Sequence, residues 1–554
     1  MSLPGFSTQA ELFSTAGLAG SLFGPSDRYR LFAQKVYPAL VCARPQLAGA
    51  YCADNGRVAL EPVLLLGVCL LQYLEAVPDR QAVEWLRYHA GWNFALNRQL
   101  GDAVFHPTTL VNFRQRLVDH DLSRLGFETV LAALIEAGLV ARQSRQRLDS
   151  TQMFGRVSRM SRLDCVRESL RLALEELAAK LPAAERPEWW ARLWERYVDT
   201  QADYRSSSET LARKLVEAGT DAQPLLDWLA TAAGQAFSGG AHAQLLARVF
   251  GEQFAVTAAT GTVQPQTKEQ LVSKRVQNPH DPDATYAVKG AGAQKKEHVG
   301  YKVQVAETVS EAVLAPGEPT GNFISGIVTH AALESDEEGA RKMEQEQQDL
   351  GLDQPPVLYV DAAYISTQQL RAAAAEGREL IGPAPGAAAQ DAARFGTDHF
   401  DIRVEQRQAT CPAGHEHSQC RRLEEPATGR VSFRFEWSTE TCTTCPLRSK
   451  CLKAEQPYRT LTVSEHHTVL QQRRREQRTE PFKQRMKHRN AIEGTQSELV
   501  RAHGLRRARY RGLPKVKLQN YFIGAACNIK RWLRRAAWEL QGHPTTPLNP
   551  AAAH

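Results

Sequence analysis

The chain has 554 residues, 43% of them hydrophobic and 23% charged, which is the composition of a globular protein with two to four domains and ample core. The formal net charge is +7, but residues 471–540 hold 19 Lys/Arg against 5 Asp/Glu, so the rest of the chain sums to −7. This polarisation argues against a generally basic protein and predicts a polyanion-binding region near the C-terminus, although solvated helix faces would give the same balance.

Neither a secretory signal nor a membrane span is expected. The first basic residue is Arg28, so the N-terminus lacks a basic leader region. The most apolar segment, residues 58–77, is interrupted by Glu61, Gln72 and Glu75 and is typical of a buried helix. A cytoplasmic protein is therefore predicted, and its ten cysteines favour thiols or metal ligands over disulfides.

The first part of the chain is predicted to be helical. Residues 1–26 are small and polar and should form a flexible N-terminus, while residues 27–142 show helical periodicity and suggest a helical DNA-binding domain. Pro107 begins a helix that carries Arg114 and Arg116 among apolar residues. Both arginines are candidate DNA contacts of a helix-turn-helix-like reader, although an ordinary packing helix fits equally well.

Next comes an α/β region with two insertions. A strand at residues 147–151 is followed by a helical insertion, residues 156–270, that carries no assignable motif. Alternating strand and helix patterns then predict an α/β sheet core. The predicted strands are residues 285–288, 300–305, 323–329, 357–361 and 379–382, and the predicted helices are residues 336–350 and 367–376.

Residues 398–463 form a cysteine-rich, strand-like segment. The knuckle Cys442-Thr-Thr-Cys445, with further cysteines at loop spacings, suits tetrahedral Zn²⁺ in a small zinc-ribbon-like insertion. Cys420, His415 and His417 are alternative ligands, and free thiols without metal are the competing interpretation. The predicted zinc ligands are Cys411, Cys442, Cys445 and Cys451.

Residues 464–540 are helical and basic. Residues 521–528 should form a core helix whose basic neighbours, Lys530 and Arg531 among them, lie on the outer face, and residues 541–554 should be a disordered tail. Cations of this density bind phosphates without reading sequence. The predicted DNA contacts here are Arg489, Arg501, Arg506, Arg507, Arg509, Arg511 and Lys515.

Three carboxylates stand in distinct settings. Asp149 lies in an alternating strand, Asp361 follows the apolar strand residues 357–360, and Glu493 lies in a basic helix four residues after Arg489. Carboxylates brought from distant parts of a chain onto one patch hold two Mg²⁺ (or Mn²⁺) ions for phosphoryl transfer. Taken singly, each has a simpler explanation as a turn residue, a helix cap or a helical ion pair.

Other acids compete for these roles. Glu498 lies five positions beyond Glu493 and faces another direction on the helix. Asp281 and Asp283 lie near the core, but their proline-rich setting favours a structural turn.

Two strand-end aspartates and a helical glutamate, separated by insertions, resemble the DDE transposases of bacterial insertion sequences over roughly residues 27–540. In that superfamily the third acid lies in a Tyr-x2-Arg-x3-Glu-x6-Lys pattern. Arg489 and Glu493 keep this spacing, whereas Met486 stands at the Tyr position and Val500, followed by Arg501, at the Lys position.

The resemblance implies an RNase H-like catalytic core built from residues 143–155, 271–397 and 464–540. It also implies cleavage at the element's ends and strand transfer by a two-metal mechanism, with Asp149, Asp361 and Glu493 as catalytic ligands. The implied partners are the terminal inverted repeats and target DNA, and a homodimer in the bacterial nucleoid is expected. The alternatives are an inactive transposase-derived repressor and a related metal-dependent nuclease.

Overall fold

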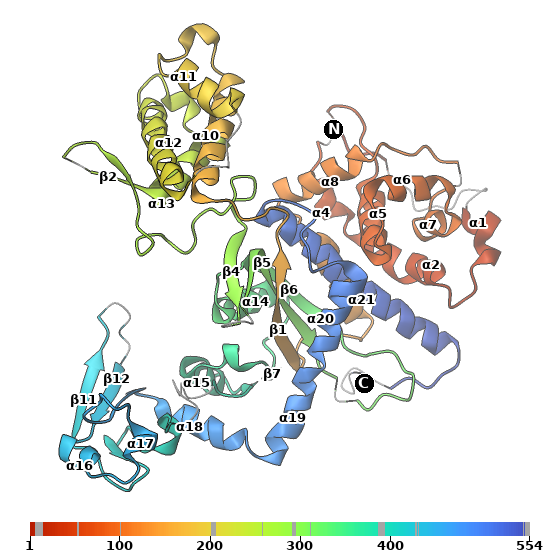
Figure 1. Ribbon diagram of the computed structural model, residues 1–554. Coiled ribbons are helices and arrows are strands. Elements are labelled where there is room, and N and C mark those ends of the chain that lie inside the picture. The colour runs from red at the N-terminus through yellow and green to blue at the C-terminus, as the bar shows by residue number, and fades with distance from the viewer. Residues whose placement is uncertain are drawn as a thin grey trace.

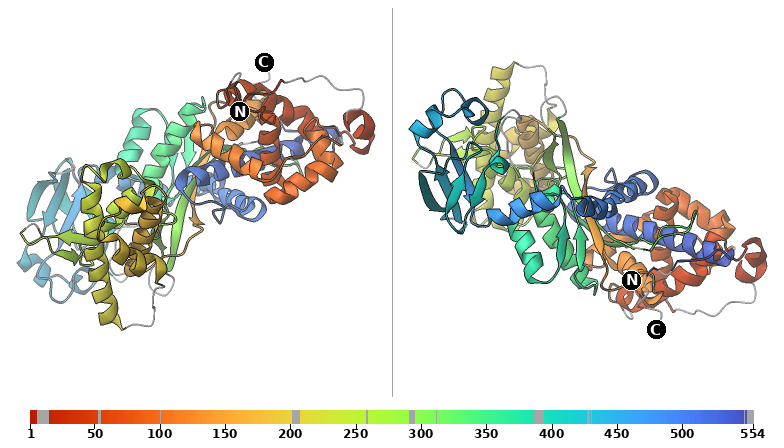
Figure 2. Two further views of the ribbon diagram at one scale, coloured as in Figure 1. Left: turned by 90° about the horizontal axis from the view of Figure 1, so that it is seen from above. Right: turned by 90° about the horizontal axis from the view of Figure 1, so that it is seen from below.

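The computed structural model in Figure 1 shows a mixed α/β protein, the class that the sequence predicted. Seen from two further sides, the molecule is elongated, with the N-terminal helices at one end and the two insertions toward the other (Figure 2). The structure describes residues 1–5, 15–52, 55–99, 101–200, 207–257, 259–290, 295–310, 312–385, 394–426, 429, 431–546 and 548.

The central sheet is mixed. The long strand β5 runs antiparallel to β1 and pairs along its other edge with β6 and, further along, with β4. On the far side of β1, β7 and β8 are parallel to it and to each other. The strands are β1 (Gln146–Phe154), β4 (Thr285–Lys289), β5 (Lys296–Thr308), β6 (Ile324–Ala331), β7 (Val357–Tyr359) and β8 (Glu379–Ile381).

Helices cover both faces of this sheet. Gln146 accepts a hydrogen bond from Gln347 of α14, whereas its neighbour Arg147 donates to the His488 carbonyl of α19. Because successive strand residues point to opposite faces, α14 and α19 lie on opposite sides of β1. The helices of this region are α14 (Asp336–Asp349), α15 (Thr367–Ala375), α18 (His467–Glu476), α19 (Glu480–Asn490), α20 (Ile492–His503) and α21 (Leu513–Leu540).

The N-terminal helices are not packed as a separate unit. Their apolar side chains join those of β5, β6 and α21 in one hydrophobic cluster, and α21 packs directly on α5, α9 and β6. A π-helical turn, Phe32–Val36, links α2 to α3. The helices are α1 (Thr15–Ala19), α2 (Arg28–Leu31), α3 (Tyr37–Cys42), α4 (Arg44–Ala48), α5 (Pro62–Glu75), α6 (Asp79–Tyr88), α7 (Ala90–Ala95), α8 (Thr108–Asp119) and α9 (Leu125–Glu136).

Both chain ends contact other parts of the protein where they are described. At the N-terminus, backbone hydrogen bonds tie Ser2 and Leu3 to residues 52, 57 and 59. Near the C-terminus, the Thr546 amide and hydroxyl both donate to Glu318. The rest of the predicted flexible segments, residues 6–14 and most of 547–554, lies outside the described residues.

The helical insertion has its own hydrophobic cluster and projects from the sheet (Figure 1). It begins after a Ser161 N-cap, whose hydroxyl accepts from the Asp164 amide. Its elements are α10 (Arg162–Ala178), α11 (Trp190–Trp194), α12 (Ser208–Leu229), α13 (Ala241–Gln253), β2 (Phe254–Val256) and β3 (Val263–Pro265).

The cysteine-rich segment also has a small core of its own, built around Phe435 and Trp437. Its strands form one three-stranded and one two-stranded antiparallel sheet. The elements are β9 (Asp401–Arg403), β10 (Gln408–Thr410), β11 (Gln419–Glu424), β12 (Val431–Glu436), α16 (Thr439–Thr443), α17 (Arg448–Cys451) and β13 (Thr460–Ser464).

Within the described residues, no single helix is long and apolar enough to cross a membrane. Helices α5 and α6 meet that test only together, as a pair bent by 108°.

Candidate active site

The sheet register brings two of the predicted acids to the same level. Strand β7 pairs in parallel with β1, with Leu358 opposite Gln146 and Tyr359 opposite Arg147. The same register continued by two residues puts Asp361 opposite Asp149. The carboxyl end of β7 thus presents Asp361 beside the middle of β1.

A single guanidinium group joins all three predicted catalytic acids. Arg489 Nη2 lies 3.3 Å from Asp149 Oδ2 and 3.9 Å from Asp361 Oδ2, and Arg489 Nη1 lies 3.5 Å from Glu493 Oε1. The structure therefore gathers residues from β1, the end of β7, α19 and α20. We call these four residues the carboxylate centre.

The helix that was expected to run through this motif is two helices. Helix α19 ends at Asn490 and α20 begins at Ile492, with Ala491 between them. Arg489 and Glu493 still form the ion pair that their spacing predicted.

The carboxylate centre opens gradually toward solvent. The Asp149 side chain is 12% exposed, that of Asp361 38% and that of Glu493 74%. Burial raises the pKa of Asp149 to about 6, even though Arg489 and the Ser150 amide favour its ionised form, and the charge of Asp361 adds to the rise. Asp361 caps a short 3₁₀ turn by accepting from the Ala363 amide at 2.8 Å. The centre is thus rich in negative charge and accessible from one side.

A second group of charges lies next to this centre on the same face of β1, and its central members are buried. Glu307 on β5 accepts hydrogen bonds from Arg147 Nε at 2.6 Å, from Arg531 Nη1 at 2.5 Å and from the Thr495 hydroxyl at 2.7 Å. Arg531 continues the group by donating to Glu498 at 2.9 Å and 3.1 Å. We call Arg147, Glu307, Thr495, Glu498, Lys530 and Arg531 the buried ion cluster.

The sequence interpretation missed this cluster and placed Arg531 on an outer face. Arg531 is only 4% exposed because its guanidinium fills the space between β5 and α20. The available signal was Glu307 itself, a charged residue inside the apolar strand run Val303–Val309.

The competing acids all have structural partners. Burial alone would raise the pKa of Glu498, but Arg531 and Lys530 lower it to about 2. Asp281 accepts from the Gly512 amide and Asp283 from the Leu513 amide, so both secure the start of α21. These contacts agree with the structural role that the proline-rich setting suggested.

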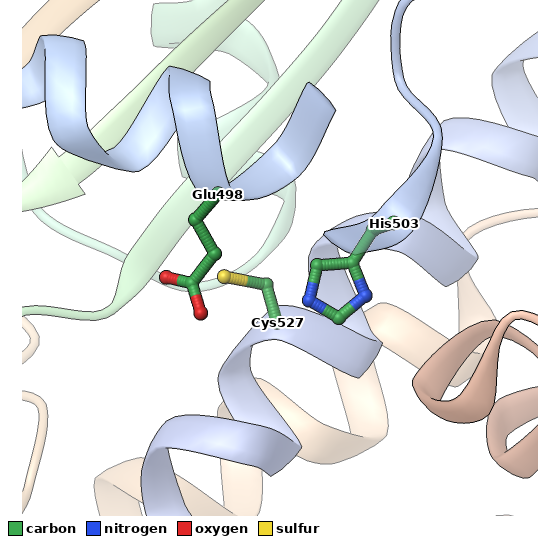
Figure 3. Close-up of side chains that lie close together, drawn as sticks. All are labelled: Glu498, His503 and Cys527. Atoms are coloured by element: carbon green, nitrogen blue, oxygen red, sulfur yellow. The ribbon is translucent and has the colours of Figure 1, made fainter. Parts of the chain in front are cut away.

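Glu498 also lies near two other potential ligands, His503 and Cys527, between α20 and α21 (Figure 3). Their ligand atoms lie within 4.8 Å of one another, and in the described part of the chain no other group of His, Cys, Asp or Glu meets that limit. His503 has its Nδ1 3.2 Å from the Tyr73 carbonyl, and Cys527 is fully buried. Because Lys530 and Arg531 already neutralise Glu498, a further cation there would face strong repulsion.

The predicted zinc ligands cluster loosely. Burial raises the pKa of the Cys451 thiol against the effect of Arg459, and the neighbouring Cys411, Cys442 and Cys445 add to the rise. The other three sulfurs therefore lie close enough to Cys451 to affect it. No three of these four sulfurs, however, all lie within 4.8 Å of one another.

The two N-terminal arginines are not free cations. Arg114 is 5% exposed and donates two hydrogen bonds to Asp79, at 3.0 Å and 2.5 Å. Arg116 donates to the Ala50 carbonyl and stacks over Tyr51. The helix α8 was predicted correctly, but Arg114 faces the interior and is not placed to touch DNA.

Most of the predicted C-terminal cations are exposed, and the segment of residues 506–508 lies beside β1. Backbone hydrogen bonds from Phe154 to Arg506 and from Ala508 to Phe154 attach this segment to the end of the strand that carries Asp149. Arg509 is partly buried over the Tyr73 ring. The exposed members of the predicted set are Arg501, Arg506, Arg507, Arg511 and Lys515.

Two family models match the chain. A transposase domain (DUF772) matches residues 21–116, and a transposase DDE domain matches residues 410–533. No curated protein and no solved structure matches it. The two matches confirm the resemblance to insertion-sequence DDE transposases, and they indicate DNA as the partner and divalent metal chemistry in general. Glu493 lies inside the second match, whereas Asp149 and Asp361 lie outside both.

Proposed function

We propose that this protein binds the ends of its insertion sequence and cleaves and transfers DNA strands at the carboxylate centre. The observation that carries the proposal is the meeting of Asp149, Asp361 and Glu493 at the Arg489 guanidinium. An RNase H-like core formed by the central sheet and the helices on its faces belongs to the same proposal. The mixed sheet with Asp149 on an inner strand supports it.

The donor set fits divalent cations. Mg²⁺ and Mn²⁺ prefer carboxylate oxygens with open positions for water and phosphate. Asp149, Asp361 and Glu493 supply such oxygens, and the raised pKa of Asp149 reflects a buried negative charge that a cation would stabilise. Bound there, two such ions would supply charge neutralisation at the phosphate and activation of the attacking oxygen.

The chain's own residues have separable tasks. Asp149 and Asp361 hold their carboxylates at one level of the sheet, and Glu493 offers its carboxylate from the solvent side. Arg489 keeps the three acids together and is within reach of a phosphate that enters the open side. The exposed cations beside β1 would hold the DNA backbone, because phosphate contacts of this kind provide affinity without sequence information.

Cleavage of plasmid DNA that carries the element's own flanking ends tests this function. In Mg²⁺, the wild type should nick or cut it, Asp361→Ala should not, and both should bind the DNA. Asp401→Ala, which removes an exposed acid of β9, is the matched control and should cleave normally.

Each other outcome has a definite meaning. Binding without cleavage by the wild type would favour a repressor, and equal cleavage by wild type and Asp361→Ala would exclude this carboxylate centre. Cleavage without joining of pre-cleaved ends would indicate a nuclease.

We also propose that Cys411, Cys442, Cys445 and Cys451 hold a structural Zn²⁺. Four thiolates satisfy tetrahedral zinc, and the segment has only a small core to stabilise it. The purified protein should contain about one zinc per chain by elemental analysis, in line with a single tetrahedral site. Cys445→Ser should lose it, whereas Cys69→Ser, at a buried cysteine of α5, should retain it.

A homodimer and a cytoplasmic, nucleoid-associated location complete the proposal. Strand transfer requires two element ends to be held together, which a pair of chains would achieve. Sedimentation of the protein with and without end DNA distinguishes a dimer formed in solution from one formed on DNA.

A further inference from the structure

We infer that Glu307, which touches none of the proposed reacting groups, is a positioning residue that sets the geometry of the carboxylate centre. This inference rests on the proposed function. Its basis is that residues of the buried ion cluster form hydrogen bonds next to three of the four residues of that centre, Asp149, Arg489 and Glu493.

The first grip is on β1. Arg147 precedes Asp149 by two residues, so the two side chains point to the same face of the sheet. Arg147 Nε donates to Glu307 Oε2 at 2.6 Å, and the two side chains are 4% and 1% exposed. The ion pair is thus shielded from water and holds β1 in place two residues before Asp149.

The second grip is on the end of α19. The same guanidinium uses Nη1 to donate to the His488 carbonyl at 3.0 Å. His488 immediately precedes Arg489, so Arg147 holds the backbone from which Arg489 reaches the three acids. Glu307 in turn holds Arg147.

The third grip is on α20. The Thr495 hydroxyl donates to Glu307 Oε1 at 2.7 Å, and Thr495 follows Glu493 by two residues. Thr495 is 4% exposed, while Glu493 is 74% exposed and, among the described residues, has its one ion pair with Arg489. The position of Glu493 therefore depends on how α20 is held, and Thr495 holds it near that end.

The cluster is rigid because almost every member has several partners. Arg531 of α21 donates to Glu307, to Glu498 and to the Asn322 carbonyl. Loss of the Glu307 charge would leave Arg147 buried without its counter-ion, and such groups relax by moving. The expected movement would displace the backbone beside Asp149, Arg489 and Glu493 together.

A second buried glutamate provides a matched control. Glu318 is fully buried like Glu307, and it pairs at 3.2 Å with Arg535, which is one turn beyond Arg531 on α21. It contacts the C-terminal segment through Thr546 rather than β1 or α20. Breaking this pair should cost stability without disturbing the carboxylate centre.

The test compares Mn²⁺ binding by the DNA-free protein, followed by calorimetry or electron paramagnetic resonance, with thermal stability. Glu307→Gln should bind Mn²⁺ about tenfold more weakly, the size of effect typical of residues that orient metal ligands. Its kcat for cleavage should fall by a similar factor while its KM for DNA stays unchanged. Glu318→Gln should lower the Tm comparably and leave Mn²⁺ affinity and kcat intact.

Thr495→Val is a milder second variant, because it removes only the hydroxyl that joins α20 to Glu307. Like Glu307→Gln, it should bind Mn²⁺ more weakly than the wild type. If Glu307→Gln does not fold, Thr495→Val alone tests the positioning role. Wild-type affinity in both variants, or an equal loss in Glu318→Gln, would overturn the positioning role.

Asp149→Asn separates this inference from the proposed function. If Asp149→Asn binds Mn²⁺ as tightly as the wild type, the proposed metal site itself is wrong, and with it the positioning role of Glu307. If Asp149→Asn loses Mn²⁺ binding while Glu307→Gln and Thr495→Val keep it, only the positioning role fails.

Discussion

The carboxylate centre and the buried ion cluster use the same kinds of side chain on the same face of β1, yet they differ in exposure and in completeness. In the cluster, the side chains of Glu307 and Arg531 are 1% and 5% exposed, and each has several close partners. In the centre, Glu493 is 74% exposed and three acids share one guanidinium. The same kinds of side chain therefore form a fully paired internal network in one place and an open, incompletely paired group in the other.

The contrast is also visible in the pKa values. Cations hold the pKa of Glu498 at about 2, so its charge is fully compensated. Burial and the neighbouring Asp361 raise the pKa of Asp149 to about 6, so the charge of Asp149 is not fully compensated. Perturbation of this second kind is common at functional sites.

The largest expected effect comes from a substitution in the carboxylate centre, and it is on activity. Asp149→Asn should reduce Mg²⁺-dependent strand cleavage by a factor on the order of a thousand or more, because a metal-binding carboxylate is lost. The ionised Asp149 costs stability above pH 6, since its folded-state pKa lies above its unfolded value, and Asn removes that cost. At pH 7.5 the Tm should therefore be unchanged or higher, as thermal melting would show. A clear drop in Tm would mean that the centre is structural.

The next largest effect is on stability. Glu307→Ala should lower the free energy of unfolding by about 3–5 kcal/mol, because two arginines lose a buried partner. Urea unfolding measures this loss, and Asp401→Ala on the surface should change it little. A loss below about 1 kcal/mol would show that Arg147 and Arg531 find other partners.

A pH series sharpens the comparison further. The folded-state pKa of Glu498 lies below its unfolded value, so its stabilising effect is complete above about pH 4.5 and is lost as the pH falls toward 2. Glu498→Gln should cost about 1–3 kcal/mol at pH 7, since one pKa unit corresponds to about 1.4 kcal/mol. The difference in the free energy of unfolding between Glu498→Gln and the wild type, measured by urea unfolding, should shrink below pH 4.5. A constant difference from pH 7 to pH 3 would contradict this account.

The smallest effect separates exposed arginines beside β1 from exposed arginines elsewhere on the protein. Arg507→Ala removes an exposed cation beside β1 and should reduce the slope of log affinity against log salt by about 1, with a uniform loss for all DNA sequences. Arg534→Ala, at an exposed position of α21 further along the chain, is the control. Equal slopes for Arg507→Ala and wild type in DNA-binding titrations would remove Arg507 from the DNA surface.

Much of the sheet was predictable because its pattern is local. The predicted strand at residues 285–288 and the helices at residues 336–350 and 367–376 match the observed elements within one residue. Strand β5 starts earlier than predicted, at Lys296, because its charged first residues pair with β4 and carry no apolar alternation. Periodicity detects a buried face but does not detect an edge hairpin.

The neighbours of the candidate site were only partly predictable. Asp149, Asp361 and Glu493 could be chosen by their settings and by family resemblance, and the structure brings them together. Arg114 and Arg531 could not be assigned, because an arginine on an amphipathic helix looks the same whether it meets phosphate or a buried acid. Only long-range contacts, such as Arg114 with Asp79, distinguish the two cases.

Helix α21 has a consequence for how this protein is made. Because it closes the hydrophobic cluster against both α5 and β6, the region matched by the first family model cannot finish packing until residues near 540 have left the ribosome. During most of its synthesis, the nascent chain therefore exposes large apolar surfaces that α21 later covers. Premature termination before α21 should yield aggregating fragments rather than a free-standing N-terminal regulator.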